Sequence, residues 1–219
     1  MGRLMSPKTP IWQASSESAP VPDRFVLASC KSGGMETPGS SDEKTVATSP
    51  VWAAPRSVVI PRAADELTML KAYLEHYRET FELKCSGVPA DRMSERSSPP
   101  STMSLHGLMR HLAGVERWWF AINFAGTDLR MLFYSDDDPD QDFESLDGDP
   151  FEALDLWRAE CERSRSIVEQ AANLDAVGVR ERNGSYTLRW LMLRTIAEYA
   201  QHAGHADFLR EGIDGAVGA

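Results

Sequence analysis

Apolar residues recur at steps of three and four through most of the chain beyond residue 64, and this periodicity constrains the fold more than any other feature. Such spacing is typical of amphipathic helices, because about 3.6 residues per turn bring these positions onto one face. The first stretch predicts a helix of about five turns that begins near Ala64 and is closed by Gly87 and Pro89. Its apolar face contains Leu67, Leu70, Leu74, Tyr77 and Phe81.

Three further helices follow from the same kind of pattern. The second begins after Ser104, a residue type that caps helix starts, and runs to about Phe124. The third spans about Phe151 to Ala172 and starts at an Asp-Pro pair. The fourth runs from about Thr187 to Glu211 and ends at Gly212. Four amphipathic helices without a convincing series of strands predict an all-α, four-helix bundle.

Residues 1–59 show neither a helical nor a strand period. They contain 10 Ser, 7 Pro and 4 Gly, which favour turns or break helices. A segment of this composition buries too little apolar surface to offset the entropy lost on ordering. We therefore predict a disordered extension at residues 1–59 and one helical domain at residues 60–219. The extension can equally come from a mis-called start codon.

Composition narrows the class of partner. The chain carries 23 Lys and Arg against 33 Asp and Glu, a formal net charge of −10. This excess of acid argues against anionic membrane surfaces and against nucleic acids, whose binding needs a cationic face. No stretch approaches the roughly 18 apolar residues of a membrane span. Three widely spaced cysteines favour a reducing, cytoplasmic location. The expected partner is a small-molecule substrate, with a homodimer left open.

Residues 128–149 contain nine Asp and Glu residues. A calcium-binding loop is one interpretation of such a segment. The segment lacks the central glycine and the ligand spacing of an EF-hand. We therefore predict a solvated acidic loop.

The fourth helix carries the residues most suited to chemistry. Glu198, His202 and His205 stand at i, i+4 and i+7, which places all three on one face within two turns. A carboxylate and an imidazole one turn apart are close enough to share a cation, and a facing helix often completes such a site. His111, beside an apolar stripe of the second helix, is the candidate.

Two histidines and one carboxylate leave coordination positions open, as in catalytic zinc sites and in the facial triad of non-haem iron. The alternative is a cluster of satisfied histidines at a helix end, with Glu198 simply ion-paired. We predict that the remaining histidines, His76 and His106, lie at the surface or its boundary.

Two blocks of sequence resemble a known family. The second helix contains RHLAGVERWWF at residues 110–120, and the fourth contains TLRW at 187–190, EYAQHAGHAD at 198–207 and LREGIDG at 209–215. Together they resemble the DinB-like superfamily, in particular an actinobacterial subgroup of unknown function that includes the mini-circle protein. The resemblance covers roughly residues 60–217 and extends, more distantly, to the mycothiol-dependent maleylpyruvate isomerases.

The resemblance implies a ligand set. In this superfamily a divalent metal is held by one His of the second helix and by two ligands one turn apart on the last long helix. These positions match His111, Glu198 and His202, and the isomerases also use a Glu at the second of them. His205 is then expected beside the ligands, where it orients one of them or moves a proton during catalysis. Arg194 departs from the subgroup, whose members often carry His there.

The expected function is a metal-dependent transferase or isomerase that uses a low-molecular-weight thiol such as mycothiol. Zinc is the expected metal, with nickel or iron as alternatives. No cysteine lies near the site residues in sequence, so the cofactor or metal-bound water would supply the nucleophile. The alternatives are a metal-dependent hydrolase on the same ligands and a non-catalytic metal-binding or stress-response protein.

Overall fold

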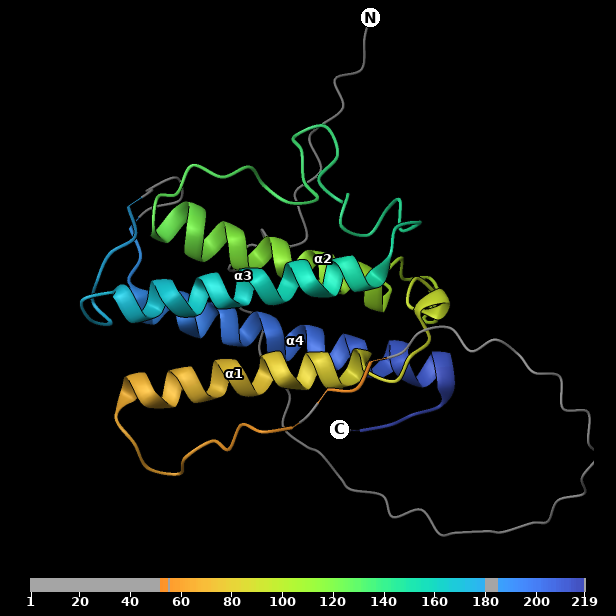
Figure 1. Cartoon of the computed structure of the whole chain (residues 1–219), viewed down its shortest axis with the longest axis horizontal. Coiled ribbons are helices and arrows are strands. Elements are labelled where there is room, and N and C mark those ends of the chain that lie inside the picture. Colours follow the sequence, from red (N-terminus) through yellow and green to blue (C-terminus); the bar gives the residue numbers. More distant parts are fainter. Residues whose placement is uncertain (1–51, 55, 180–184, 219) are drawn as a thin grey trace, which may run out of the picture. The chain divides into compact units, whose positions relative to one another are not determined.

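The computed structural model describes residues 52–54, 56–179 and 185–218. The described residues form an all-α bundle, as predicted, and their only strand pairing is an isolated bridge between Val177 and Thr187 (Figure 1). None of the helices in these ranges combines the length and the apolar character that crossing a membrane requires. In chain order the helices are α1 (Glu66–Cys85), η2 (Ala90–Arg92), α2 (Leu105–Glu116), the π-helical continuation η3 (Arg117–Phe124), α3 (Pro150–Gln170) and α4 (Leu188–Asp214).

The helix starts follow from local capping. The Ser104 side chain accepts a hydrogen bond from the Gly107 amide at 3.1 Å, and Asp149 accepts one from the Phe151 amide at 2.9 Å. Each bond satisfies an amide that has no partner within the first turn of its helix. Both predicted starts, at Ser104 and at the Asp-Pro pair, are therefore confirmed.

The end predicted for α4 at Gly212 is wrong. The helix continues to Asp214, and Gly215 ends it in the left-handed region with a φ of 76°. Gly212 has a different role, because a Cβ there would lie 2.7 Å from the Ser97 carbonyl oxygen. The glycine thus allows the loop before α2 to approach α4 closely.

The helices form two parallel pairs. Ion pairs join α1 and α4 near both starts, between Glu66 and Arg189, and near both ends, between Lys84 and Asp207. Figure 1 shows that α2 and α3 also run side by side in one direction, opposite to that of α1 and α4. Because α3 runs parallel to α2, the chain must return along the bundle before α3 begins. Residues 125–149 make this return, and they therefore pass along α2.

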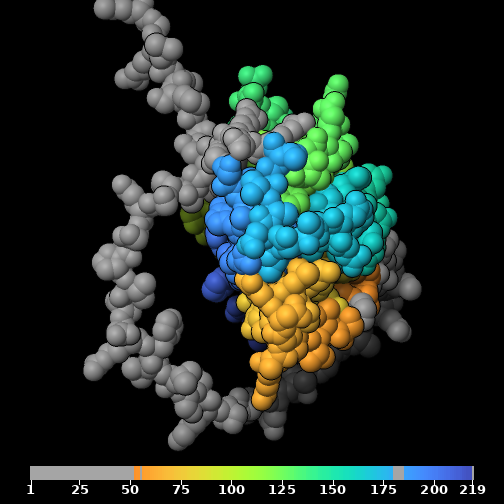
Figure 2. All heavy atoms as spheres, turned by 90° about the vertical axis from the view of Figure 1, so that its left-hand side faces the viewer, coloured from red at the N-terminus to blue at the C-terminus, as the bar shows by residue number. Residues whose placement is uncertain are grey.

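The described residues between α3 and α4 lie at one end of the bundle. The Leu188 amide donates to the Ala176 carbonyl at 2.8 Å, and Arg189 pairs with Asp175 as well as with Glu66 of α1. Figure 2 views this end, where the end of α3 and the start of α4 pack against each other and above α1. The first turn of α4 is thereby fixed to the start of α1 and to the residues that follow α3.

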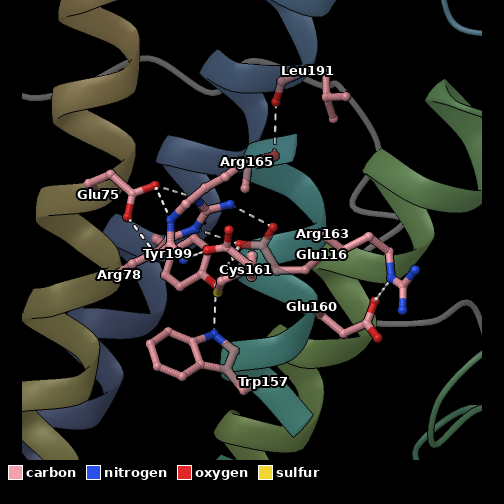
Figure 3. A network of polar contacts seen from close by, with 12 residues as sticks. Glu75, Arg78, Glu116, Trp157, Glu160, Cys161, Arg163, Arg165, Leu191 and Tyr199 are labelled. Carbon is pink, nitrogen blue, oxygen red and sulfur yellow. Dashed lines mark hydrogen bonds and ion pairs between the residues drawn. The ribbon is translucent and has the colours of Figure 1, made fainter. Parts of the chain in front are cut away.

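A buried polar network crosses the core and involves all four long helices (Figure 3). Arg78 of α1 donates to both carboxylate oxygens of Glu116 on α2, at 2.8 and 2.7 Å. The Tyr199 hydroxyl of α4 donates to Glu116 at 2.8 Å and accepts from the Trp157 indole of α3 at 2.8 Å. Burying two charges is unfavourable unless each is fully partnered, so this network permits few alternative helix registers.

The segment before α1 contacts the bundle where it is described. The Trp52 ring packs edge-on against Phe151 at 5.2 Å, and the amides of Ser57 and Val58 donate to the Glu79 carboxylate. Trp52 thus packs against α3, and Ser57 and Val58 pack against α1, while the disorder predicted for residues 1–59 stays a prediction. Residues 1–51 lie outside the described ranges, and the domain boundary at residue 60 stays a prediction.

Candidate metal centre

Three side chains meet where α2 faces α4. His111, Glu198 and His202 each offer a ligand atom, and these atoms lie within 4.8 Å of one another. The exposed fractions are 5%, 6% and 3%, so the cluster is shielded from bulk water. The i, i+4 spacing on α4 and the apolar stripe around His111 on α2 account for this meeting. The role of these residues as metal ligands stays a prediction.

The donor atoms converge on one point. Nε2 of His111 lies 3.4 Å from Glu198 Oε1, and Nε2 of His202 lies 3.3 Å from the same oxygen. In a tetrahedral zinc site with bonds of about 2.0–2.1 Å, neighbouring ligand atoms are about 3.3–3.4 Å apart. The two distances to the shared oxygen therefore match those of a zinc site, and such a coordination would leave room for one more ligand.

The other nitrogen of each ring is also engaged. His111 Nδ1 lies 2.7 Å from Asp142 Oδ2, and His202 Nδ1 lies 3.2 Å from His205 Nδ1. Contacts of this kind fix ring orientation and tautomer in metal sites. Half-buried His205 thus lies beside a candidate ligand, the position that the resemblance implied, while its catalytic role stays a prediction.

Asp142 is a site residue that the sequence did not indicate. It belongs to the segment predicted to be a solvated acidic loop, yet its side chain is only 14% exposed and the neighbouring Phe143 ring stacks on His111. The prediction is wrong for this part of the loop, because the chain returns along α2 and reaches His111 there. Nine acidic residues look alike in the sequence, and only this tertiary contact distinguishes one of them.

Arg110 anchors the same part of the loop. Its guanidinium donates to the carbonyls of Gln141, Glu144 and Ser145 and lies 4.1 Å above the centre of the Phe133 ring. The residue that precedes His111 on α2 therefore holds the backbone on both sides of Asp142. In this way α2 positions the candidate ligand and also the partner that orients it.

The charges of the cluster favour metal-binding protonation states at two of its residues. Burial raises the pKa of Glu198, but hydrogen bonds from His111, His202 and Arg194 outweigh it and lower that pKa. Burial also lowers the pKa of His202. An ionised carboxylate and a neutral imidazole are the forms that bind metals. Burial likewise lowers the pKa of His111, but its bonds to Asp142 and Glu198 prevail and raise it to about 9, so a cation competes with a proton there.

Arg194 occupies the second oxygen of Glu198. It lies one turn earlier on α4, and its Nη1 pairs with Glu198 Oε2. This leaves Oε1 to face the two histidines. The departure noted in the sequence thus lies in direct contact with the candidate ligand set.

The other two histidines lie apart from the cluster. His76 is half-buried beside Tyr77, which confirms the predicted boundary position. The prediction for His106 is wrong, because it is only 2% exposed. Its amide donates to the Met93 carbonyl, its ring contacts Ser94, and burial followed by the charge of Arg110 lowers its pKa to about 4.

Comparison with known proteins identifies the family. A family model described as Mycothiol-S-transferase matches residues 69–215. The chain belongs to the mycothiol-S-transferase family. The match extends from α1 to the end of α4 and contains all three residues of the cluster, and it confirms the suspected link to mycothiol-dependent DinB-like proteins. Among curated proteins no match to the chain is found.

Proposed function

We propose that the chain is a metal-dependent transferase that uses a low-molecular-weight thiol of the mycothiol type. His111, Glu198 and His202 would hold the divalent ion, with zinc as the expected metal. The observation that carries the proposal is the convergence of two imidazole nitrogens on one carboxylate oxygen within a mycothiol-S-transferase domain. A bound divalent metal would lower the pKa of the thiol and so favour the nucleophilic thiolate.

The cysteines of the chain support an external thiol. Cys85 and Cys161 are buried, and burial raises the pKa of both thiols. A buried thiol with a raised pKa is a poor nucleophile. Cys30 lies outside the described residues. Because neither described cysteine suits nucleophilic chemistry, the proposal assigns the nucleophile to a small-molecule thiol and places the reaction in the cytoplasm, where such thiols stay reduced.

The chain's residues then have separate tasks. Asp142 and His205 hold the outer nitrogens of the two histidines, so that both Nε2 atoms stay aimed at the ligand point. Half-buried His205 connects His202 to the surface and can exchange a proton with solvent. An isomerase would need the same thiolate. It would differ from a transferase because the thiol would be released unchanged at the end of the reaction. A hydrolase would use the same three residues, but family membership favours thiol transfer.

The test is a transfer assay with the purified full chain. The zinc-loaded protein is incubated with mycothiol and a general electrophile such as chlorodinitrobenzene, and the conjugate is measured by mass spectrometry. We expect conjugation above the uncatalysed rate, lost on chelation and restored by zinc. Full activity after complete metal removal, or none with any thiol in the zinc-loaded protein, would contradict the proposal.

A further inference from the structure

Arg194 faces both the candidate metal centre and solvent. It stands at i, i+4 and i+8 with Glu198 and His202, which places the three side chains along one ridge of α4. Its side chain is 28% exposed, whereas that of Glu198 is 8% exposed. A guanidinium has five N–H donors, and in the described part of the chain its one hydrogen bond is to Glu198. The remaining donors are available to an incoming molecule.

The charge of the site favours an anion. The two positive charges of a divalent cation would be balanced by the carboxylates of Glu198 and Asp142. Arg194 then gives the site a net charge of one positive unit. A planar guanidinium suits a carboxylate in particular, because it binds both oxygens through parallel hydrogen bonds. An excess positive charge with free donors beside a reactive centre is an arrangement that recognises a negatively charged group on a substrate.

An aromatic surface adjoins this charge. Trp190, one turn before Arg194, is 45% exposed, and its ring contacts those of Trp119 and Tyr186 at 5.6 and 5.3 Å. The neighbouring Leu193 is 52% exposed. Residues four apart on a helix are neighbours, so a molecule that reaches Arg194 can also rest on the Trp190 ring. The ring contacts hold that surface in place.

We propose that Arg194 is the specificity-determining residue of the site and binds the carboxylate of an acceptor substrate whose apolar body rests on Trp190. The substrate class is therefore small aromatic or apolar carboxylic acids. This inference depends on the proposed function, because the anion is recognised beside the metal. Arg194 also places a positive charge close to the metal position, since it holds one oxygen of Glu198 while the other oxygen faces the two histidines.

These two roles predict opposite effects of one substitution. Arg194→Gln should tighten metal binding by about three- to tenfold, because a positive charge near the cation is removed. The same variant should weaken carboxylate binding by at least about tenfold, because a charge-assisted pair of hydrogen bonds is lost. A purely structural role would instead weaken both.

The experiment uses the full chain loaded with Co²⁺, whose visible spectrum reports ligands at the metal. Co²⁺ affinity is measured against a competing chelator, and benzoate and acetate are then titrated into the loaded protein. Arg189→Gln is the matched control, because it removes an α4 arginine of similar exposure that pairs with Glu66 and Asp175 instead. Arg189→Gln should change neither the Co²⁺ affinity nor the carboxylate affinity. Trp190→Ala should weaken benzoate binding but not acetate binding.

The outcomes separate the two proposals. Loss of Co²⁺ affinity in Arg194→Gln, or unchanged benzoate affinity in that variant, would overturn the role of Arg194. A wild-type protein that binds Co²⁺ but not benzoate would overturn the substrate class while leaving the metal centre intact. A wild-type protein that binds no Co²⁺ would overturn the proposed function and this inference with it.

Discussion

The ring of His111 is oriented by a residue 31 positions further along the chain. Asp142 holds Nδ1 and thereby directs Nε2 toward Glu198, while His205 acts in the same way on His202. At the scale of single residues, the proposed metal centre would depend on these outer contacts as well as on the candidate ligands themselves. Removing such an outer partner typically weakens a metal site by 10- to 100-fold.

Asp142→Asn should weaken zinc affinity by about 10- to 100-fold, because the amide cannot replace the charged partner of His111. Asp137→Asn removes an exposed carboxylate of the same loop and should have little effect. Zinc titration against a chromophoric chelator measures both variants. Equal affinities would show that Asp142 does not support the metal centre.

His106 should make stability depend on pH. Its pKa is lowered to about 4 by burial and by Arg110, against an ordinary value of 6.5. In the unfolded chain the His106 imidazole therefore binds a proton below about pH 6.5, whereas in the folded chain it does so only near pH 4. The free energy of unfolding contributed by this residue is thus present at pH 7 and is lost as pH falls through this window.

Urea denaturation at pH 7 and pH 5 tests this prediction. Between pH 7 and pH 5, the free energy of unfolding should fall by about 2 kcal/mol more in the wild type than in His106→Gln. Other titrating groups are common to both proteins and cancel in the comparison. An equal loss in the variant would show that His106 remains solvated.

At the scale of elements, the network around Glu116 fixes α2 against α4 and α1. Arg78 is 3% exposed, so without its partner it would become an uncompensated buried charge. Tyr199, which donates to Glu116, directly follows the candidate ligand Glu198 on α4. The register that brings the candidate ligands together is therefore the register that satisfies this network.

Glu116→Gln should lower the free energy of unfolding by about 3–5 kcal/mol, because it breaks a buried ion pair. Glu160→Gln is the control: Glu160 is equally buried, but its partners Arg117 and Arg163 reach solvent. For this control we expect the free energy of unfolding to fall by only about 1–2 kcal/mol. Both are measured by urea denaturation, and equal losses would argue against a special role for the Arg78–Glu116 pair.

The helices could be predicted because each carries its own apolar face and capping residues, which are local properties. The paired charges could not, since Arg78 and Glu116 are 38 residues apart and charged side chains usually lie on exposed faces. The end of α4 was missed for a related reason. Gly212 marks a close approach by Ser97, which only the tertiary structure shows.

At the scale of the whole described domain, topology determines which residues complete the site. Periodicity predicts four helices but not which of them run parallel. Because α2 and α3 are parallel neighbours, residues 125–149 must return along α2, and this path carries Asp142 to His111. The three candidate ligands could be proposed from helical spacing and family resemblance, and Arg194 is likewise one turn from Glu198 on α4, whereas the contact of Asp142 with His111 required the fold.

The proposed function requires that His111, Glu198 and His202 hold one divalent metal. The test is the zinc content of the wild type, His202→Ala and His76→Ala after zinc loading and dialysis, with circular dichroism to confirm folding. The wild type and His76→Ala should retain about one zinc per chain, and His202→Ala should lose it, because only His202 belongs to the cluster. Equal zinc content in the two folded variants would contradict the claim.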